Sequence, residues 1–330
     1  MYSHQALPRA LSQSEATIAI DRLVRACIDS SSPAFHVWTT PTGREEIRNT
    51  RLSRHFQDVQ QLLNSYDDRY DYSPSLELFW QACHDIGLER DPNGPICRES
   101  FNSGYHSHHK SMNTLVDKIR ELAMHPSFRR APADRRSAFK KRIEVFETYI
   151  PYVMEKSPCT TIVRLDLHYR SAVNQFIRIE HVYHDLDTLI RKREQHSAFK
   201  HETGYVWSIE QGKDRGFHIH IAFLFDGRYI KDDWGKSVQI GELWQEITRG
   251  KGYFFSCNNS RHKARFHKEG RLAVGMFEQP YEAEYSKIFY GIGYVAKNDQ
   301  PLLVKPKGRR TYGKGQMPKL RQQWLLKEPT

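Results

Sequence analysis

Cysteine is scarce in this chain and never clustered. Only five cysteines occur among 330 residues, and no two of them form a C-x-x-C pair. Disulfide frameworks and structural zinc sites both need clustered cysteines, so neither is predicted, and a reducing compartment is expected. The sequence also lacks an apolar run of about 18 residues, the length that spans a bilayer, and its first residues contain no apolar signal core. We therefore expect a cytoplasmic protein without a membrane partner.

A nucleotide-binding loop is missing as well. G-K-S occurs at residues 235–237, but Ile230 stands where a P-loop requires its first glycine. The pattern therefore excludes a helicase motor of the P-loop type. Internal repeats and low-complexity segments are also absent from the sequence.

Charge divides the chain into two dissimilar halves. Apolar residues make up 38% and aromatic residues 12% of the chain, which is typical of folded domains, and its length suggests two of them. Residues 1–150 contain 20 Lys and Arg against 19 Asp and Glu, whereas residues 151–330 contain 30 against 20. Most of the net charge of +11 therefore lies in the second half. This excess indicates a polyanionic partner there.

The first half reads as a mainly α-helical N-terminal domain, residues 1–150. Capping residues and apolar periodicity predict its helices. They are expected from Ser12 to the S-S-S-P segment and at residues 52–63, 75–86, 111–124 and 134–149. His106, His108 and His109 form a histidine-rich segment without a nearby carboxylate, so we interpret them as structural. The composition suits a packing or interaction domain, which contacts DNA or another replication protein.

The second half is centred on a predicted β-hairpin, residues 205–225. Two strands flank the turn G-K-D-R-G, and apolar residues alternate with polar ones in the second strand. His218 and His220 therefore share one face of that strand. If the hairpin folds about Asp214, Glu210 lies opposite His218 and Ser208 lies opposite His220. One carboxylate and two imidazoles are thus expected to converge.

Such a cluster has the ligands for a divalent metal ion with open coordination positions. A His-x-His pair alone is more often just the polar face of an amphipathic strand. Glu210 at the matching position of the hairpin favours the metal site. An earlier predicted strand, residues 160–169, places Asp166 and His168 on its polar face, where either side chain could orient a metal-bound histidine or simply face solvent.

The remaining second half alternates strands and helices. A long helix is expected at residues 173–196 before the hairpin, and a helix at 241–248, strands at 253–257 and 271–277, and a helix at 282–297 after it. The last of these helices would carry Tyr290, Tyr294 and Lys297 on one stripe. Tyrosines at this spacing are often core aromatics. Two glycines between the two tyrosines, Gly291 and Gly293, are costly in a helix and instead suggest that the backbone lies close to a sheet or a DNA strand.

The final segment, residues 301–330, reads as a basic C-terminal tail. Seven basic residues and no acid occur between Lys305 and Arg321. Such a segment is either a solvated terminus or an arm that tracks phosphates. On the second interpretation the DNA-contacting residues are Lys305, Lys307, Arg309, Arg310 and Lys314.

The motifs of the second half resemble a known superfamily. His218-Ile219-His220 on a strand, followed by Y-x-x-K at residues 294–297, resembles the HUH endonucleases, and within them the inovirus-type rolling-circle replication initiators of filamentous phages and prophage-like elements. The resemblance covers roughly residues 150–300. It implies an α+β fold with a ferredoxin- or RRM-like antiparallel sheet, the HUH palm. It also implies Mg²⁺ or Mn²⁺ on Glu210, His218 and His220, and a nicking tyrosine.

The expected function is therefore metal-dependent, tyrosine-mediated nicking and joining of single-stranded DNA at a replication origin. The resemblance implies a covalent phosphotyrosine intermediate, with Tyr294 or Tyr290 as nucleophile and Lys297 as a nearby cation. Partners would be an origin hairpin, a host helicase and a polymerase. Three alternatives stay open: a transposase or relaxase of the same superfamily, a nucleic-acid-binding protein without catalysis, and a zinc hydrolase that would work without either tyrosine.

Overall fold

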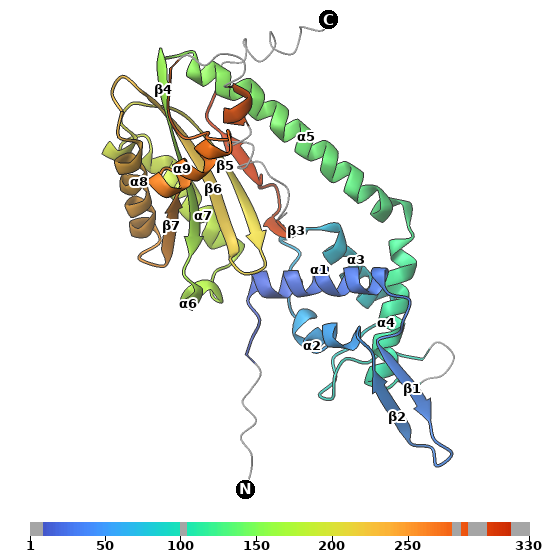
Figure 1. Cartoon of the computed structure of the whole chain (residues 1–330). Helices are drawn as coiled ribbons and strands as arrows, with labels where there is room; N and C mark the ends of the chain where they lie inside the picture. Colours follow the sequence, from blue (N-terminus) through green and yellow to red (C-terminus); the bar gives the residue numbers. More distant parts are fainter. Residues whose placement is uncertain (1–8, 100–103, 279–284, 290–301, 318–330) are drawn as a thin grey trace, which may run out of the picture. The chain divides into compact units, whose positions relative to one another are not determined.

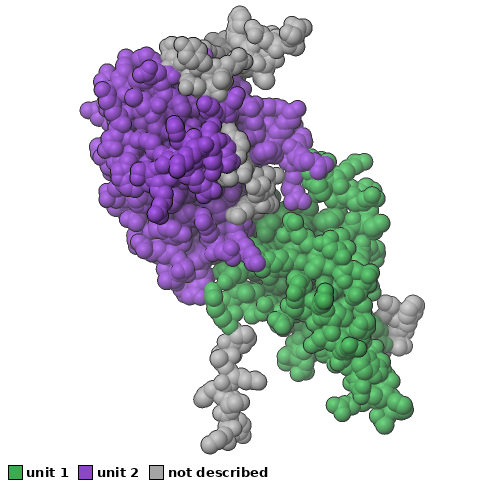
Figure 2. All heavy atoms as spheres, viewed as in Figure 1, with its two compact units in different colours: residues 1–134, 303–307 green, residues 135–302, 308–330 purple. Residues whose placement is uncertain are grey.

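The computed structural model describes residues 9–99, 104–278, 285–289 and 302–317. The chain forms two compact units, coloured in Figure 2: residues 1–134 with 303–307, and residues 135–302 with 308–330. The sequence predicts a domain boundary at residue 150, whereas in the structure the first unit ends at residue 134 and the second begins at residue 135. The C-terminal part of helix α5 (Pro126–Met154) accounts for the difference, because its side chains from Phe146 to Met154 pack in the core of the second unit.

The first unit is built around helices whose apolar faces meet in one core. Ile20, Leu23 and Leu76 are fully buried there. Its elements are α1 (Gln13–Asp29), β1 (Phe35–Thr39), β2 (Glu45–Asn49), η1 (Ser53–His55), α2 (Val59–Leu62), β3 (Tyr70–Tyr72), α3 (Pro74–Asp85) and α4 (His108–Ala123), labelled in Figure 1. Helix α1 begins as the sequence predicts, because Ser12 and Glu15 form a capping box.

Three details of the first unit differ from the sequence prediction. The helix expected at residues 52–63 is broken into η1 and α2. The hairpin β1–β2 was not predicted. Residues 303–307 belong to this unit, because β9 (Val304–Pro306) pairs antiparallel with β3. Part of the expected basic tail is therefore a strand.

The second unit is an antiparallel sheet with helices packed against it (Figure 1). Its strands run in the order β10-β5-β6-β4-β7, and β8 also pairs with β4. Its elements after α5 are β4 (Cys159–Tyr169), α6 (Ser171–Asn174), α7 (Ile179–Lys192), η2 (Ser197–Phe199), β5 (Glu202–Gly212), β6 (Gly216–Asp226), α8 (Asp233–Ile247), β7 (Gly252–Ser256), α9 (Ser260–Lys268), β8 (Gly275–Glu278) and β10 (Tyr312–Lys314). The fold is thus mixed α and β with a multi-stranded antiparallel sheet. The helix expected at 173–196 is interrupted between α6 and α7, and α9 was not predicted.

The two faces of this sheet have different roles. Odd-numbered residues of β6, such as Phe217 and Phe223, are fully buried on one face. Helix α8 packs on this side, where Trp244 contacts the ring of Tyr169 from β4. The opposite face meets the end of α5 at one end, where Ala222 and neighbouring apolar side chains lie. Its other end carries polar side chains. No helix within the described residues is both long and apolar enough to cross a membrane.

Candidate metal centre

The hairpin β5–β6 positions the candidate ligands in the predicted register. Glu210 pairs with His218 and Ser208 with His220, as expected from a turn centred on Asp214. Gly216 begins the second strand with φ +61°, a conformation that favours glycine. A Cβ at Gly216 would also lie 2.7 Å from the amide of Asn174, so that side chain would have to shift to admit a larger residue.

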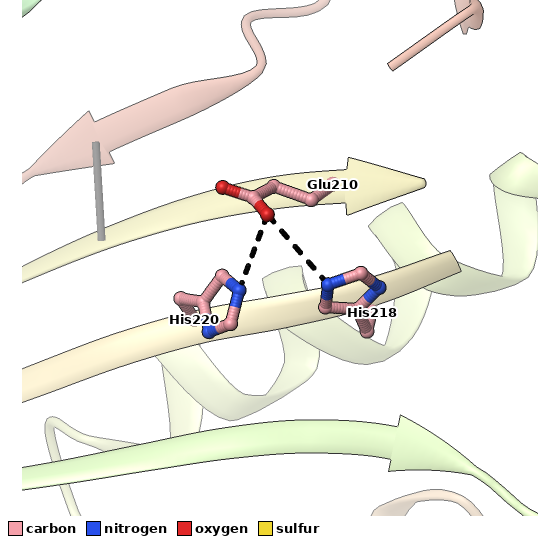
Figure 3. Close-up of side chains that lie close together, drawn as sticks. All are labelled: Glu210, His218 and His220. Carbon is pink, nitrogen blue, oxygen red and sulfur yellow. Dashed lines mark ion pairs between the residues drawn. The ribbon is translucent and has the colours of Figure 1, made fainter. Parts of the chain in front are cut away.

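Glu210, His218 and His220 converge at one end of the polar face (Figure 3). The Nε2 atoms of His218 and His220 lie 3.7 Å and 3.3 Å from Oε2 of Glu210. One ligand atom from each residue lies within 4.8 Å of the other two, close enough for a single ion to touch all three. Among the described residues, this is the group of three or more metal-ligating side chains that the structure brings together. All three are almost entirely buried.

The hydrogen bonds of the imidazoles suit metal binding. His218 Nδ1 lies 3.1 Å from the carbonyl oxygen of Gly216, and His220 Nδ1 lies 2.6 Å from Oδ1 of Asp166. In a neutral ring, donation from Nδ1 leaves the Nε2 lone pair free to bind an ion on the side of Glu210. Glu210 Oε1 and Ser208 Oγ are buried without a hydrogen-bond partner among the described residues. A divalent cation would satisfy this buried carboxylate, so the residues present fit a metal ion.

Electrostatics keep the two carboxyl groups ionised. Burial raises the pKa of Asp166, but the charges of Arg164 and His220 outweigh it and hold that pKa far below its usual range. Burial likewise opposes ionisation of Glu210, whose pKa is nevertheless lowered by its bonds to His218 and His220. Burial lowers the pKa of His220, whereas Asp166 and Glu210 raise it more, to about 9. The cluster is therefore prepared to exchange a proton on His220 for a cation.

Asp166 and His168 lie beside the ligands in different ways. Asp166 accepts a hydrogen bond from His220 Nδ1 and faces Arg164 Nη2 at 3.3 Å. His168 makes no such bond to a ligand: its ring stacks on the ring of His218, with centroids 5.4 Å apart. Its Nδ1 is buried without a partner among the described residues. Burial, then the charge of His218, lowers the pKa of His168 to about 4, so its ring is neutral.

Two further side chains near the ligands were not found by sequence reasoning. Tyr312 of β10 lies opposite Ser208 in the register, on the same sheet face. The guanidinium of Arg142 from α5 lies 4.9 Å from the centre of the Tyr312 ring. Burial lowers the pKa of Arg142, and the charge of Glu210 partly offsets this. Arg142 is one of many basic residues on the predicted helix, and no sequence pattern sets it apart from the others as a residue near the candidate site.

The remaining predicted site residues fall elsewhere. Tyr290, Tyr294 and Lys297 lie outside the described residues. Residues 285–289, which precede them, are helical, and Ile288 is fully buried in the cluster that covers the apolar end of the ligand-bearing face. The rings of His108 and His109 pack against Phe35, whereas His106 Nδ1 lies 3.6 Å from Oε1 of Glu99, a nearby carboxylate that the sequence interpretation did not expect. The structural role of the three histidines stays a prediction.

The described part of the expected basic arm, residues 302–317, is divided between the two units. Lys305 of β9 forms an ion pair with Asp71, and Arg309 pairs with Asp187 on α7 at 2.7 Å. Lys314 lies in β10 with its ammonium 4.7 Å from the ring centre of Tyr149. Lys307 and Arg310 are exposed. The ion pairs reduce the charge that Lys305 and Arg309 can offer to phosphates, and the role of the five residues in DNA binding stays a prediction.

A comparison with protein families now places the chain. The model of the family described as the YagK/YfjJ C-terminal domain matches residues 129–315, more than half of the sequence. The chain belongs to the YagK/YfjJ C-terminal domain family. The match extends from α5 to just beyond β10, so this family domain contains the metal-centre residues together with Arg142 and Tyr312. Neither a curated protein nor a solved structure matches the chain.

The candidate metal centre can be tested by removing one charge. Glu210→Gln keeps the shape of the side chain but removes its negative charge. We expect Mn²⁺ affinity to fall at least about 10- to 100-fold, since loss of even an outer partner of a ligand has such an effect. Isothermal titration with Mn²⁺ measures the affinity. Glu246→Gln, on the exposed side of α8, is the matched control and should bind Mn²⁺ like the parent protein.

Proposed function

We propose that this protein nicks and rejoins single-stranded DNA in a metal-dependent reaction that uses a tyrosine nucleophile. The observation that carries the proposal is the buried Glu210, His218 and His220 cluster on a strand pair, with Glu210 Oε1 left unsatisfied. A buried, anionic, three-ligand site is suited to a catalytic ion with open positions. The excess of positive charge in residues 151–330 suits a polyanionic substrate.

The arrangement of the second unit supports an HUH-type palm. Strands β5, β6, β4 and β7 are adjacent in that order, and α7 and α8 lie in the chain between β4 and β5 and between β6 and β7. This β-α-β-β-α-β succession with an antiparallel sheet supports the ferredoxin-like arrangement that the HUH resemblance implies. The two histidines lie on β6, which is central in the sheet.

The position of residues 285–289 supports a tyrosine nucleophile. Ile288 packs on the same sheet face that carries the ligands, although at its apolar end. The sequence that follows Phe289 contains Tyr290, Tyr294 and Lys297. The chain therefore enters its tyrosine-containing segment from the face that holds the metal centre. This placement suits delivery of a phenol to a phosphate bound there.

Each side chain has a defined task in the proposed reaction. Glu210, His218 and His220 would hold Mg²⁺ or Mn²⁺, and Asp166 would keep His220 in the orientation that metal binding requires. The ion would supply Lewis-acid stabilisation of the negative charge that develops on the phosphate. The Tyr294 oxygen would form a bond to phosphorus as the bond from phosphorus to the 3′ oxygen breaks, with the phenol proton lost and a proton gained by the 3′ oxygen.

The product suits the start of rolling-circle replication. The enzyme would retain the 5′ side of the nick as a tyrosyl phosphate, and the free 3′-OH could prime a polymerase. Because the covalent bond conserves the energy of the phosphodiester, the strand could be rejoined without ATP. We therefore place this activity at the origin of a phage or prophage-like element, with a host helicase as the partner that separates the strands.

A trapping experiment tests the proposal directly. Protein incubated with labelled single-stranded origin DNA and Mn²⁺ should give a covalent protein–DNA band that survives denaturation, and EDTA should prevent it. Cleavage that needs metal but leaves no covalent band would instead assign a hydrolase that activates water. DNA binding without any cleavage, at every metal tested, would assign a binding protein and refute the nicking activity.

A further inference from the structure

The strand β7 presents exposed aromatic rings on the ligand-bearing face of the sheet. Tyr253 and Phe255 are 37% and 44% exposed, although large aromatic side chains are usually buried. In the register they pair with His168 and Asp166 of β4, which flank the metal centre. Within the described part of the chain, β7 is the outermost strand on its side of the sheet. The two rings therefore continue the ligand-bearing face as far as the edge of the sheet.

A row of stacked rings connects this edge to the metal centre. The His218 and His168 ring centres lie 5.4 Å apart at an interplanar angle of 24°, and those of His168 and Tyr253 lie 5.0 Å apart at 20°. The row begins at a metal ligand and ends at an exposed phenol ring. His168 and His218 are buried, so Tyr253 is the exposed ring of this row. Exposed aromatic rings are what nucleic-acid bases stack on in proteins that bind single strands.

The helix α9 is rich in basic residues and contacts the same strand. Residues 260–271 contain five Lys and Arg against one acid, Glu269. His262 of α9 lies edge-on to Phe255, with ring centres 5.6 Å apart, so the helix and the aromatic strand are in contact. Glu269 pairs with Arg265 and Arg271, and Lys263 pairs with Asp233. Arg261 and Lys268 have no ion-pair partner among the described residues, and both are exposed.

We infer that Tyr253 and Phe255 of β7, with Arg261 and Lys268 of α9, form the track on which single-stranded DNA lies as it leaves the metal centre. The identity of the polyanion as DNA rests on the proposed function. Exposed rings beside unpaired basic residues match the alternation of bases and phosphates in a single strand. A duplex would not expose its base faces to Tyr253 and Phe255, so the surface suits a single strand. We call these four residues the β7–α9 track.

The aromatic part of the track is tested by Tyr253→Leu with Phe255→Leu. Leucine keeps apolar surface on the strand but cannot stack on a base. We expect the affinity for a fluorescent oligo(dT), measured by anisotropy in EDTA, to fall about 10- to 100-fold. The matched control is Tyr229→Leu, because Tyr229 is 60% exposed but follows β6 at the strand end opposite His218. It should leave affinity unchanged, and circular dichroism should show both variants folded.

The basic part is tested by Arg261→Gln with Lys268→Gln. Loss of two phosphate contacts should reduce the slope of log affinity against log salt by about 1.4 in magnitude. Lys231→Gln, an exposed lysine outside the track, should leave the slope unchanged. Unchanged oligo(dT) binding in both track variants would overturn the inference. A second outcome would also overturn it: the charge variant weakens the binding of duplex and single-stranded DNA equally, and the leucine variant weakens neither.

These outcomes are independent of the nicking reaction. Binding in EDTA needs neither the ion nor a tyrosine nucleophile, so track-dependent oligo(dT) binding can hold even if no covalent product forms. Conversely, a covalent product could form in Mn²⁺ while the track variants bind oligo(dT) as well as the parent protein does. That result would support the nicking activity and refute the track. The two proposals therefore fail separately.

Discussion

Replacing both His218 and His220 by Ala should reduce covalent product formation by at least about 10³-fold. The variant loses two of three candidate ligands and with them the charge stabilisation that a bound ion would give, a contribution of several kcal/mol. The fold should persist, because the opposite face of β6 keeps its buried apolar side chains such as Phe217, Ile219 and Ile221. Quantifying the Mn²⁺-dependent protein–DNA band under denaturing conditions measures the effect.

A matched variant separates loss of the ion from general damage. His181 and His184 lie on the exposed side of α7, and their double replacement by Ala should leave product formation within about two-fold of the parent. The His218 and His220 variant should also keep its oligo(dT) affinity in EDTA. Full nicking by that variant would refute a catalytic role for the metal centre.

Tyr294→Phe should eliminate the covalent product, whereas Tyr290→Phe should permit the first cleavage and impair the later strand transfer. Only Tyr294 has a lysine three residues further on, and on the predicted helix this places a cation beside the phenol, which favours its ionised form. Tyr290 would lie one helical turn earlier, about 6 Å along the axis, close enough to act in a second transfer.

Peptide mapping of the trapped product identifies the nucleophile. A DNA-linked peptide containing only Tyr290 would reverse the assignment. Products on both tyrosines would indicate that they alternate. The Phe variants keep the aromatic ring and remove only the hydroxyl, so each serves as the packing control for the other.

Local pattern was sufficient to predict that the three candidate ligands converge. The polar turn at Asp214 fixes which residues of the hairpin face each other, and alternation fixes which side they occupy, so Glu210, His218 and His220 follow from one short segment. Asp166 could be placed only on the polar face of its strand. Its pairing with His220 depends on the register between β4 and β6, which are 54 residues apart at that point and share no turn.

The missed features have physical reasons. Helix α9 contains only Ala264 and Phe266 as apolar residues and buries none of its side chains, so no apolar stripe marks it. The strand β9 lies in a segment whose basic composition resembles a solvated tail, and its pairing with β3 joins residues more than 200 positions apart. Arg142 approaches the site only because the end of α5 packs on the sheet. Each of these depends on contacts that no local window contains.

The placement of β9 and β10 has a consequence for how the chain matures during synthesis. The first unit needs residues 303–307 to complete its β3–β9 pair, and the sheet of the second unit needs β10 at residues 312–314. Domains usually fold in order as they emerge from the ribosome. Here an N-terminal unit that waits for β9 would remain incomplete until the chain has been made beyond residue 307. By then most of the second unit has also been made, so both units would reach their final form almost together.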